Sequence, residues 1–241
     1  MNTLTCEWFG RVPYEEGLVL QETAVQERSH SLSMPDKLIL LEHPHTFTFG
    51  LRSDPHNLLI NEAQLAKQGV SVHHVRRGGD ITYHGPNQLV GYPIFNIKRT
   101  NSRLGYRPLN VRAFIQTLEN CLIHALSDFG ILGWREDKYP GVWVEKNGSQ
   151  AKIAAIGVHI NQYRISSHGF ALNVDPDMSF FDKIIPCGIQ EYQVTSMSEV
   201  LKRPLSLSEL LPHIESAFKH NFKFDEVKRD AKIIANESIG Y

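Results

Sequence analysis

Apolar residues recur at helical spacing in segment 110–129, which carries the strongest periodic pattern in the chain. Val111, Phe114 and Ile115 begin a stripe that continues through Leu118, Leu122, Ala125, Leu126 and Phe129. Asn110 is suited to cap the N-terminus of such a helix, and Gly130 to follow its C-terminus. This segment is therefore predicted to be an amphipathic helix.

Three further helices are predicted. Ser206 and Glu209 form a capping-box pattern, and the apolar stripe that follows continues to Phe218 although Pro212 lies in the first turns. Weaker helical patterns cover 14–27 and 61–68, and the second of these ends before Gly69. Helices are therefore expected on both sides of the strand-rich middle of the chain.

Strand-like runs are more numerous than helical ones. Asn147 and Gly148 are suited to a tight turn between the runs 142–145 and 152–160, and a further run follows close behind. Three consecutive antiparallel strands with helices before and after them indicate an α+β fold. The predicted strands are 37–42, 71–76, 89–97, 142–145, 152–160 and 163–174.

Composition narrows the class of protein. The chain has 241 residues, 41% of them hydrophobic, which is enough for a sizeable core. Its formal net charge is −1, unlike the clearly basic balance of a dedicated nucleic-acid binder. No apolar run is long enough to span a bilayer, and the N-terminal residues do not resemble a signal peptide. We expect one domain over 1–241, without nucleic-acid or membrane partners.

Three cysteines, Cys6, Cys121 and Cys187, form no CxxC pair, and their odd number argues against a disulfide framework. A reducing, cytoplasmic location is therefore expected. Cys121 lies close to the apolar stripe of the 110–129 helix, and we interpret it as a small buried hydrophobic residue. Cys187 stands between Pro186 and Gly188, and a cysteine in such a turn is the better candidate for a nucleophile.

The segment 76–88 is the most unusual in composition. Gly78, Gly79 and Gly85 permit close approach of a ligand to the backbone, and they alternate with charged and aromatic side chains. It matches neither a P-loop nor a dinucleotide-binding fingerprint. A glycine-rich turn with a solvated pair, Arg76 and Arg77, is an equally good interpretation from composition alone.

Two other features have competing interpretations. Lys152 precedes a run of small and apolar residues, where it is either a snorkelling side chain at a strand edge or a partly desolvated amine. Among the 12 histidines, His43 with His45 and His73 with His74 are the tightest groups. Neither group has zinc-like spacing, and neighbours on a strand point to opposite faces, so hydrogen-bonding roles are favoured over metal ligation.

Seven blocks, in order along the chain, resemble the lipoyl(octanoyl) transferase family. They span roughly 38–197, and Asn87 departs from the glycine that many members have in the His-Gly-Pro-Gly-Gln stretch. Because Asn tolerates left-handed backbone better than most residues, the turn is expected to survive. The blocks are 43–50, 77–94, 141–144, 152–157, 168–174, 185–189 and 194–197.

The resemblance implies a mixed, largely antiparallel sheet with flanking helices, as in biotin- and lipoate-protein ligases, with a C-terminal helical segment at about 206–241. It implies transfer of an octanoyl or lipoyl group from acyl carrier protein to a lysine of lipoyl domains, among them those of 2-oxoacid dehydrogenase complexes and the glycine cleavage H protein. Cys187 and Lys152 match the family's catalytic pair. No cofactor and no metal are implied. The matching acyl-pocket residues are Arg77, Gly78, Gly79, Asp80, Ile81, Thr82, Tyr83, His84, Ala155, Ile156, Gly157, Gly169, Phe170 and Ala171.

The chemistry of these residues agrees with the resemblance. A thiol is only slightly ionised near neutral pH, and a nearby ammonium would stabilise its thiolate. Exchange between thioesters needs no nucleotide, which fits the absent P-loop. Two alternatives stay open: an ATP-dependent lipoate-protein ligase of the same fold, and a non-catalytic adaptor that binds acylated carrier protein.

Overall fold

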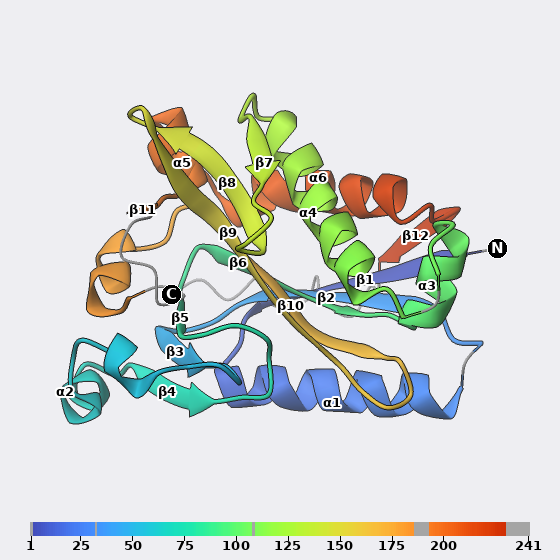
Figure 1. Ribbon diagram of the computed structural model, residues 1–241, viewed down its shortest axis with the longest axis horizontal. Coiled ribbons are helices and arrows are strands. Elements are labelled where there is room, and N and C mark those ends of the chain that lie inside the picture. The colour runs from blue at the N-terminus through green and yellow to red at the C-terminus, as the bar shows by residue number, and fades with distance from the viewer. Residues whose placement is uncertain (1, 32, 108, 186–192, 230–241) are drawn as a thin grey trace, which may run out of the picture.

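A computed structural model describes residues 2–31, 33–107, 109–185 and 193–229. The helices are α1 (Tyr14–His30), α2 (Glu62–Lys67), α3 (Ile97–Arg103), α4 (Val111–Ser127), α5 (Met197–Leu201) and α6 (Leu207–Asn221). The strands are β1 (Thr3–Arg11), β2 (Asp36–Glu42), β3 (Thr46–Phe49), β4 (Ser71–His74), β5 (Thr82–His84), β6 (Gln88–Ile94), β7 (Gly133–Arg135), β8 (Gly141–Lys146), β9 (Ser149–Ile160), β10 (Ser166–Asn173), β11 (Gln193–Val194) and β12 (Glu226–Arg229). Figure 1 shows their arrangement.

The main sheet has nine described strands in the order β12-β1-β2-β6-β10-β9-β8-β7, with β11 paired to β9 off this path. The pairs from β2 through β7 are antiparallel, whereas β12–β1, β1–β2 and β11–β9 are parallel. A smaller sheet has the order β4-β3-β5. The α+β class with a mixed, largely antiparallel sheet is thus confirmed.

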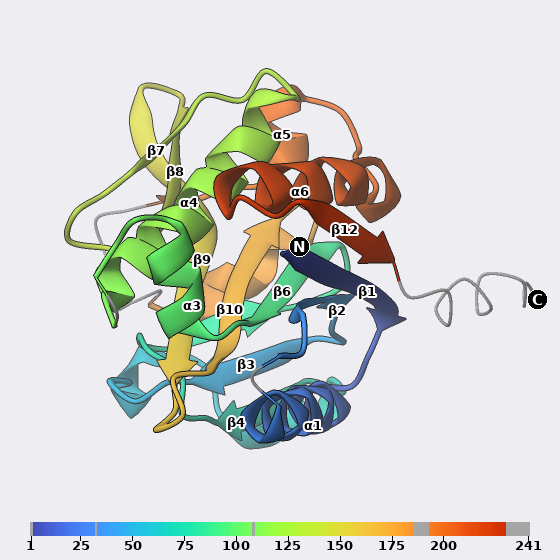
Figure 2. The ribbon, with the colours of Figure 1, turned by 90° about the vertical axis from the view of Figure 1, so that its right-hand side faces the viewer.

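Helices cover both faces of the main sheet. Figure 2 shows α4 and α6 on one side and α1 on the other. The larger core lies under α4 and α6, where Phe114, Phe218 and Phe222 surround the buried ring of Phe95. A second cluster, which includes Ile39, Val90 and Tyr92, lies under α1. The two faces of the sheet therefore carry separate apolar layers.

The predicted helices form close to their expected limits. Asn110 caps α4 by accepting a hydrogen bond from the Ala113 amide, and Ser206 and Glu209 form the predicted capping box at α6. The turn between β8 and β9 uses Asn147 and Gly148, both with positive φ. Asn87 is also left-handed, with φ 60°, so that turn survives as expected. Local sequence signals were sufficient at these places.

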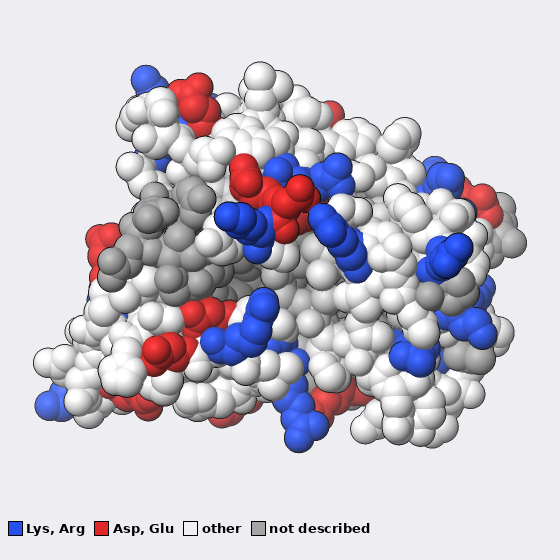
Figure 3. Space-filling view, in the orientation of Figure 1, with Lys and Arg blue, Asp and Glu red and all other residues white. Residues whose placement is uncertain are grey.

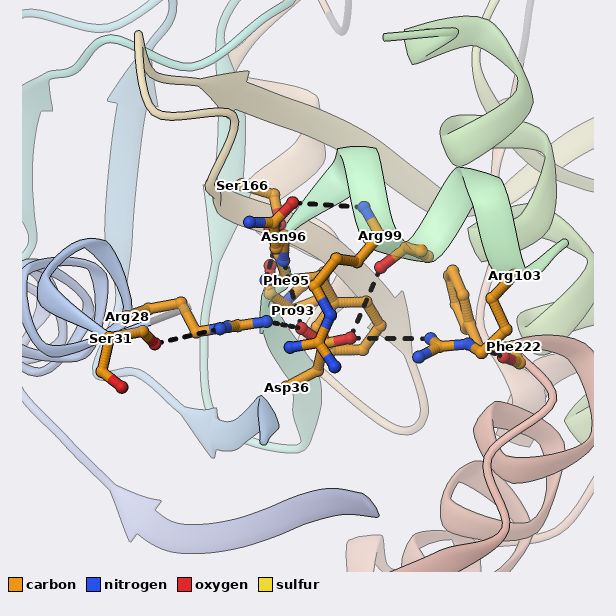
Figure 4. Close-up of polar contacts among 11 residues, drawn as sticks. Arg28, Ser31, Asp36, Pro93, Phe95, Asn96, Arg99, Arg103, Ser166 and Phe222 are labelled. Carbon is orange, nitrogen blue, oxygen red and sulfur yellow. Dashed lines mark hydrogen bonds and ion pairs between the residues drawn. The ribbon is translucent and has the colours of Figure 1, made fainter. Parts of the chain in front are cut away.

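The predicted strand 89–97 ends early, because β6 stops at Ile94 and α3 begins at Ile97. Asn96 caps α3 by accepting from the Arg99 amide, and its own amide donates to the buried carboxylate of Asp36 at 3.1 Å. Arg28 of α1 donates to the same carboxylate at 2.9 Å. Figure 4 shows this polar cluster, which joins α1, β2 and α3.

That residues 1–241 form a single domain with a C-terminal segment from about 206 stays a prediction. In the described part of that segment, α6 packs against α4 and β12 extends the sheet beside β1. Within the described ranges, no helix has the length and apolar composition needed to cross a membrane.

Candidate active site

A bulge on β9 sets the direction of the Lys152 side chain. Val142 of β8 pairs with Ala154, but the next residue, Trp143, pairs with Lys152, so β9 contains one extra residue at Ile153. Ile153 and Ala154 both belong to the core under α4 and α6. A bulge of this kind interrupts the alternation of a strand.

As a result, Lys152 lies on the same face as Ala155 and Gly157, and all three line one cleft. Unbroken alternation would instead place Lys152 with Ala154 in the apolar core. The bulge thus carries the lysine onto the face that the neighbouring strand β10 lines with Gly169 and Ala171.

Lys152 is buried, with 8% of its surface exposed. Its ammonium donates to the Pro140 carbonyl at 3.4 Å and lies 4.8 Å from the centre of the Trp143 ring. Because β9 is flanked by β8 and β11 at this point, the interpretation as a strand-edge side chain is wrong. Lys152 is a largely desolvated amine with an oriented carbonyl and an aromatic face beside it.

The peptide that follows Pro140 is held from its other side by Glu119 of α4. The Gly141 amide donates to the Glu119 carboxylate at 2.9 Å. Burial raises the pKa of Glu119, while the Gly141 amide, Arg135 and Lys152 oppose that shift. Gly141 has φ 137°, and a Cβ there would lie 2.3 Å from the Ala154 carbonyl oxygen, so this position requires glycine.

The glycine-rich segment packs directly over β9. The Gly78 amide donates to the Val158 carbonyl at 3.2 Å, and a Cβ on Gly157 would lie 2.6 Å from the Gly78 oxygen. Backbone therefore packs on backbone here, which makes the cleft narrow. Outside this contact, Arg52 and Lys138 line the mouth together with Tyr139. Figure 3 shows this face hollowed near its centre, with charged side chains gathered around the hollow.

Arg77 is buried, contrary to the interpretation as half of a solvated arginine pair. Its guanidinium donates to the Thr48 carbonyl at 2.6 Å, to the Thr48 hydroxyl at 2.9 Å and to the Gly78 carbonyl at 3.0 Å. Arg76 is exposed, as expected. Arg77 thus connects the smaller sheet to the glycine-rich segment and keeps that segment over the cleft.

Aromatic polar side chains also line the cleft, namely those of Tyr14, His84, Tyr92 and His168. Burial lowers the pKa of His168 to about 4 and that of His84 well below its usual value, and Arg77 adds to both shifts. Burial also raises the pKa of Tyr14 to about 12, opposed by Arg77. These groups are therefore uncharged near neutral pH.

His43 lies next to Tyr92: its Nε2 is 2.7 Å from the Tyr92 hydroxyl, and its Nδ1 is 2.7 Å from the Val12 carbonyl oxygen. Burial lowers the pKa of His43 to about 4. A carbonyl cannot donate, so Nδ1 carries the proton and the Tyr92 hydroxyl donates to Nε2. His73 stacks on Tyr14 and His74 on Phe49, which gives both histidines packing roles.

The structure brings most of the residues predicted from the sequence into this one cleft. Tyr83 is the exception: it is fully buried beside Phe180, and its hydroxyl contacts His45 at 2.8 Å. Cys187 lies outside the described residues. The predicted residues that line the cleft are Lys152, Arg77, Gly78, Gly79, Asp80, Ile81, Thr82, His84, Ala155, Ile156, Gly157, Gly169, Phe170 and Ala171.

Five lining residues were not predicted as site residues: Tyr14, Val90, Tyr92, Pro140 and His168. Tyr92 and His168 stand inside blocks that resemble the family, so the blocks contained a usable signal for them. Tyr14 comes from α1, far from any block, and only the packing of α1 against the sheet brings it to the cleft.

The fold of the chain matches that of lipoate-protein ligases. A lipoate-protein ligase A bound with ATP superimposes with a TM-score of 0.71 at 13% identity, covering 97% of this chain and 91% of that chain. A bipartite lipoate protein ligase from Thermoplasma acidophilum also gives 0.71 at 12% identity, over 96% and 89% of the two chains. These likenesses establish the class of fold.

Sequence comparison defines the family within this class. The family model for the lipoyl protein ligase A/B catalytic domain matches residues 13–219. The chain is 45% identical to an octanoyltransferase of Acidobacterium capsulatum, over 85% of this chain and 83% of the relative. It is 40% identical to the mitochondrial octanoyltransferase LIP2 of Arabidopsis thaliana, over 97% and 95%. The chain therefore belongs to the lipoyl protein ligase A/B family and, within it, groups with the octanoyltransferases.

One relative is longer. The chain is 42% identical to an octanoyltransferase of Myxococcus xanthus over 96% of its own length, but it spans only 62% of that relative.

Proposed function

We propose that this protein is an acyltransferase that moves an octanoyl or lipoyl group from acyl carrier protein to a specific lysine of a lipoyl domain. The observation that carries the proposal is the buried Lys152 ammonium at one end of a narrow cleft, in a chain 40–45% identical to octanoyltransferases. The relatives supply the reaction type, and the cleft offers a place for a hydrocarbon chain.

In the proposed reaction, the Cys187 thiolate attacks the thioester carbonyl of the donor. A carbon–sulfur bond to Cys187 forms, the bond to the carrier thiol breaks, and the carrier leaves as a thiolate that takes up a proton. The acceptor lysine then attacks the acyl-enzyme as a neutral amine, an amide bond forms, and Cys187 is released. Lys152 stabilises the Cys187 thiolate, gives a proton to the departing carrier thiolate in the first step, and takes up the proton that the acceptor nitrogen loses in the second.

The lining of the cleft suits a hydrocarbon chain. Ile81, Ile156 and Phe170 supply apolar surface, while Ala155 and Gly157 leave space beside β9. Burial of each CH₂ contributes about 0.8 kcal/mol, so an eight-carbon chain gains several kcal/mol from such a site. This gain favours octanoyl donors over thioesters with shorter acyl chains.

The acceptors proposed are the lipoyl domains of 2-oxoacid dehydrogenase complexes and the glycine cleavage H protein, and the proposed location is the cytoplasm. A lipoate-protein ligase would use the same fold but would activate a free acid with ATP. An adaptor would bind acylated carrier protein without forming a covalent intermediate. The identity to octanoyltransferases favours transfer from a thioester over both alternatives.

Single-turnover transfer tests the proposal. Purified full-length protein, octanoyl–carrier protein and apo-lipoyl domain are mixed without nucleotide, and the acceptor is followed by intact mass. We expect the acceptor to gain one octanoyl group. A requirement for ATP with free octanoate would establish the ligase instead, and binding without any transfer would establish the adaptor.

A further inference from the structure

A second cavity lies on the α1 side of the sheet, next to the cleft, with which it shares His168. It is an open groove between one face of α1 and the ends of β9 and β10. Its lining combines apolar residues of α1 with polar residues of the hairpin. The lining residues are Leu18, Gln21, Glu22, Val25, Gln26, Arg76, His159, Asn161, Ser167 and His168.

His168 separates this groove from the cleft. Among the described residues, it is the lining residue that the two cavities share. Phe170, two residues further along β10, belongs to the core under α4 and α6, whereas the His168 ring packs edge-on against Tyr92 beneath α1. Its left-handed backbone, with φ 53°, accompanies this change of side.

We call the His168 side chain, which lies between the cleft and the groove, the partition. The His168 amide donates to the side-chain oxygen of Gln21 at 2.6 Å, which fixes the backbone of the partition to α1. However, His168 Nδ1 and Gln21 Nε2 are buried, and within the described ranges neither has a hydrogen-bond partner. Removal of the ring would therefore break no hydrogen bond through Nδ1.

His168 and Lys152 also lie at different positions along the cleft that both of them line. On β9, Lys152 stands six residues before Val158, the residue with which His168 pairs. The extra residue at Ile153 leaves five strand steps between these two positions, so the cleft follows β9 from Lys152 to the position beside His168. An acyl chain attached near Lys152 therefore points either out of the mouth or toward His168.

We propose that the His168 side chain ends the acyl cleft and thereby limits the length of the acyl chain that the protein transfers. The inference rests on the proposed octanoyl transfer. Beyond His168, Leu18 and Val25 offer apolar surface in the groove to which a longer chain would gain access. The histidine is thus a specificity-determining residue. With its side chain present the cleft is closed toward the groove, and without it the cleft opens into the groove.

The positive φ at this position offers a clean test, because glycine adopts it without strain. His168→Gly removes the partition and keeps the backbone. The full chain is assayed with octanoyl- and dodecanoyl-carrier protein as donors and apo-lipoyl domain as acceptor. Each additional CH₂ that reaches apolar surface contributes about fourfold in affinity. We expect the ratio of kcat/KM for dodecanoyl over octanoyl to rise at least tenfold over the wild type.

Two further variants control the test. His168→Asn keeps a residue that tolerates left-handed backbone and shortens the side chain, so it should raise the ratio by less than glycine does and carries the test if the glycine variant does not fold. His159→Ala alters the outer groove alone, since His159 lines the groove and not the cleft. It should leave the ratio unchanged.

An unchanged ratio in folded His168→Gly, or in folded His168→Asn where only that variant folds, would overturn the inference. A rise of equal size in His159→Ala would also overturn it, because the groove rather than the partition would then set the limit. Absence of octanoyl transfer by the wild-type chain would instead contradict the proposed function, which keeps the two failures distinct.

Discussion

The Gly141 amide donates to the buried Glu119 carboxylate, and this contact helps to hold the peptide whose carbonyl accepts a hydrogen bond from the Lys152 ammonium. The Pro140 carbonyl and the Gly141 amide belong to the same planar peptide unit. The contact with Glu119 of α4 therefore orients the carbonyl that accepts from Lys152 of β9. Glu119 therefore acts as a positioning residue for Lys152, although it does not line the cleft itself.

Replacement of Glu119 by alanine should lower kcat for octanoyl transfer about tenfold or more, with little change in KM for the donor, because Lys152 loses its fixed carbonyl. Glu119→Gln should restore much of the rate, since an amide oxygen still accepts from Gly141. Steady-state kinetics of both variants checks this. Thr117→Val, which alters another buried polar side chain of α4, is the matched control. Equal loss in Glu119→Gln and Glu119→Ala would contradict the positioning role.

Lys152→Ala should slow alkylation of Cys187 at neutral pH and shift the midpoint of the rate profile upward by about one pH unit or more, because the thiolate loses a nearby cation. Lys152→Arg should keep much of the thiolate yet transfer poorly, since guanidinium does not exchange protons near pH 7. Iodoacetamide rates against pH measure both effects. Burial raises the pKa of Cys6 and of Cys121, so these thiols should contribute little background. An unchanged midpoint in Lys152→Ala would refute the pairing.

Stability should fall as the pH drops from about 6.5 to 4. Burial holds the pKa of His43 and that of His168 at about 4, from a reference value of 6.5, so in this window the unfolded chain binds protons that the folded chain does not. Each buried neutral histidine thus contributes to the free energy of unfolding above pH 6.5, the pKa in the unfolded chain. This contribution is lost as the pH falls toward the folded-state pKa of about 4, by at most about 3 kcal/mol per histidine. Urea denaturation at pH 7 and pH 5 measures the loss.

Substitution identifies the histidines responsible for that slope. His43→Gln removes the titrating group, so the difference in stability between pH 7 and pH 5 should shrink. His30→Gln, at an exposed position at the end of α1, should leave the difference unchanged. The same slope in wild type and His43→Gln would show that other groups control the acid sensitivity.

Local signals were enough to predict the elements that rest on local physics. The α4 stripe, the α6 capping box and the Asn147–Gly148 turn all appear where periodicity and capping place them. Family-like blocks brought together nearly all the residues that line the cleft. The sequence was informative wherever the structural cause lay within a few residues.

The features that the sequence did not predict depend on contacts between distant residues. β1 pairs in parallel with β2, from which α1 separates it, and with β12, which lies at the other end of the described chain. The bulge at Ile153 shows only in the register against β8, and the burial of Tyr83 requires packing against Phe180. No spacing in the sequence indicates that the His168 ring lies under α1.

The central claim is that Cys187 carries the acyl group without nucleotide, and intact mass tests it most directly. Wild-type protein incubated with octanoyl–carrier protein, without ATP and without acceptor, should gain the mass of one octanoyl group and lose it when apo-lipoyl domain is added. Cys6→Ala and Cys121→Ala should acylate normally, because both thiols are buried. Cys187→Ala should not acylate while remaining folded. Normal adduct formation by Cys187→Ala would contradict the account.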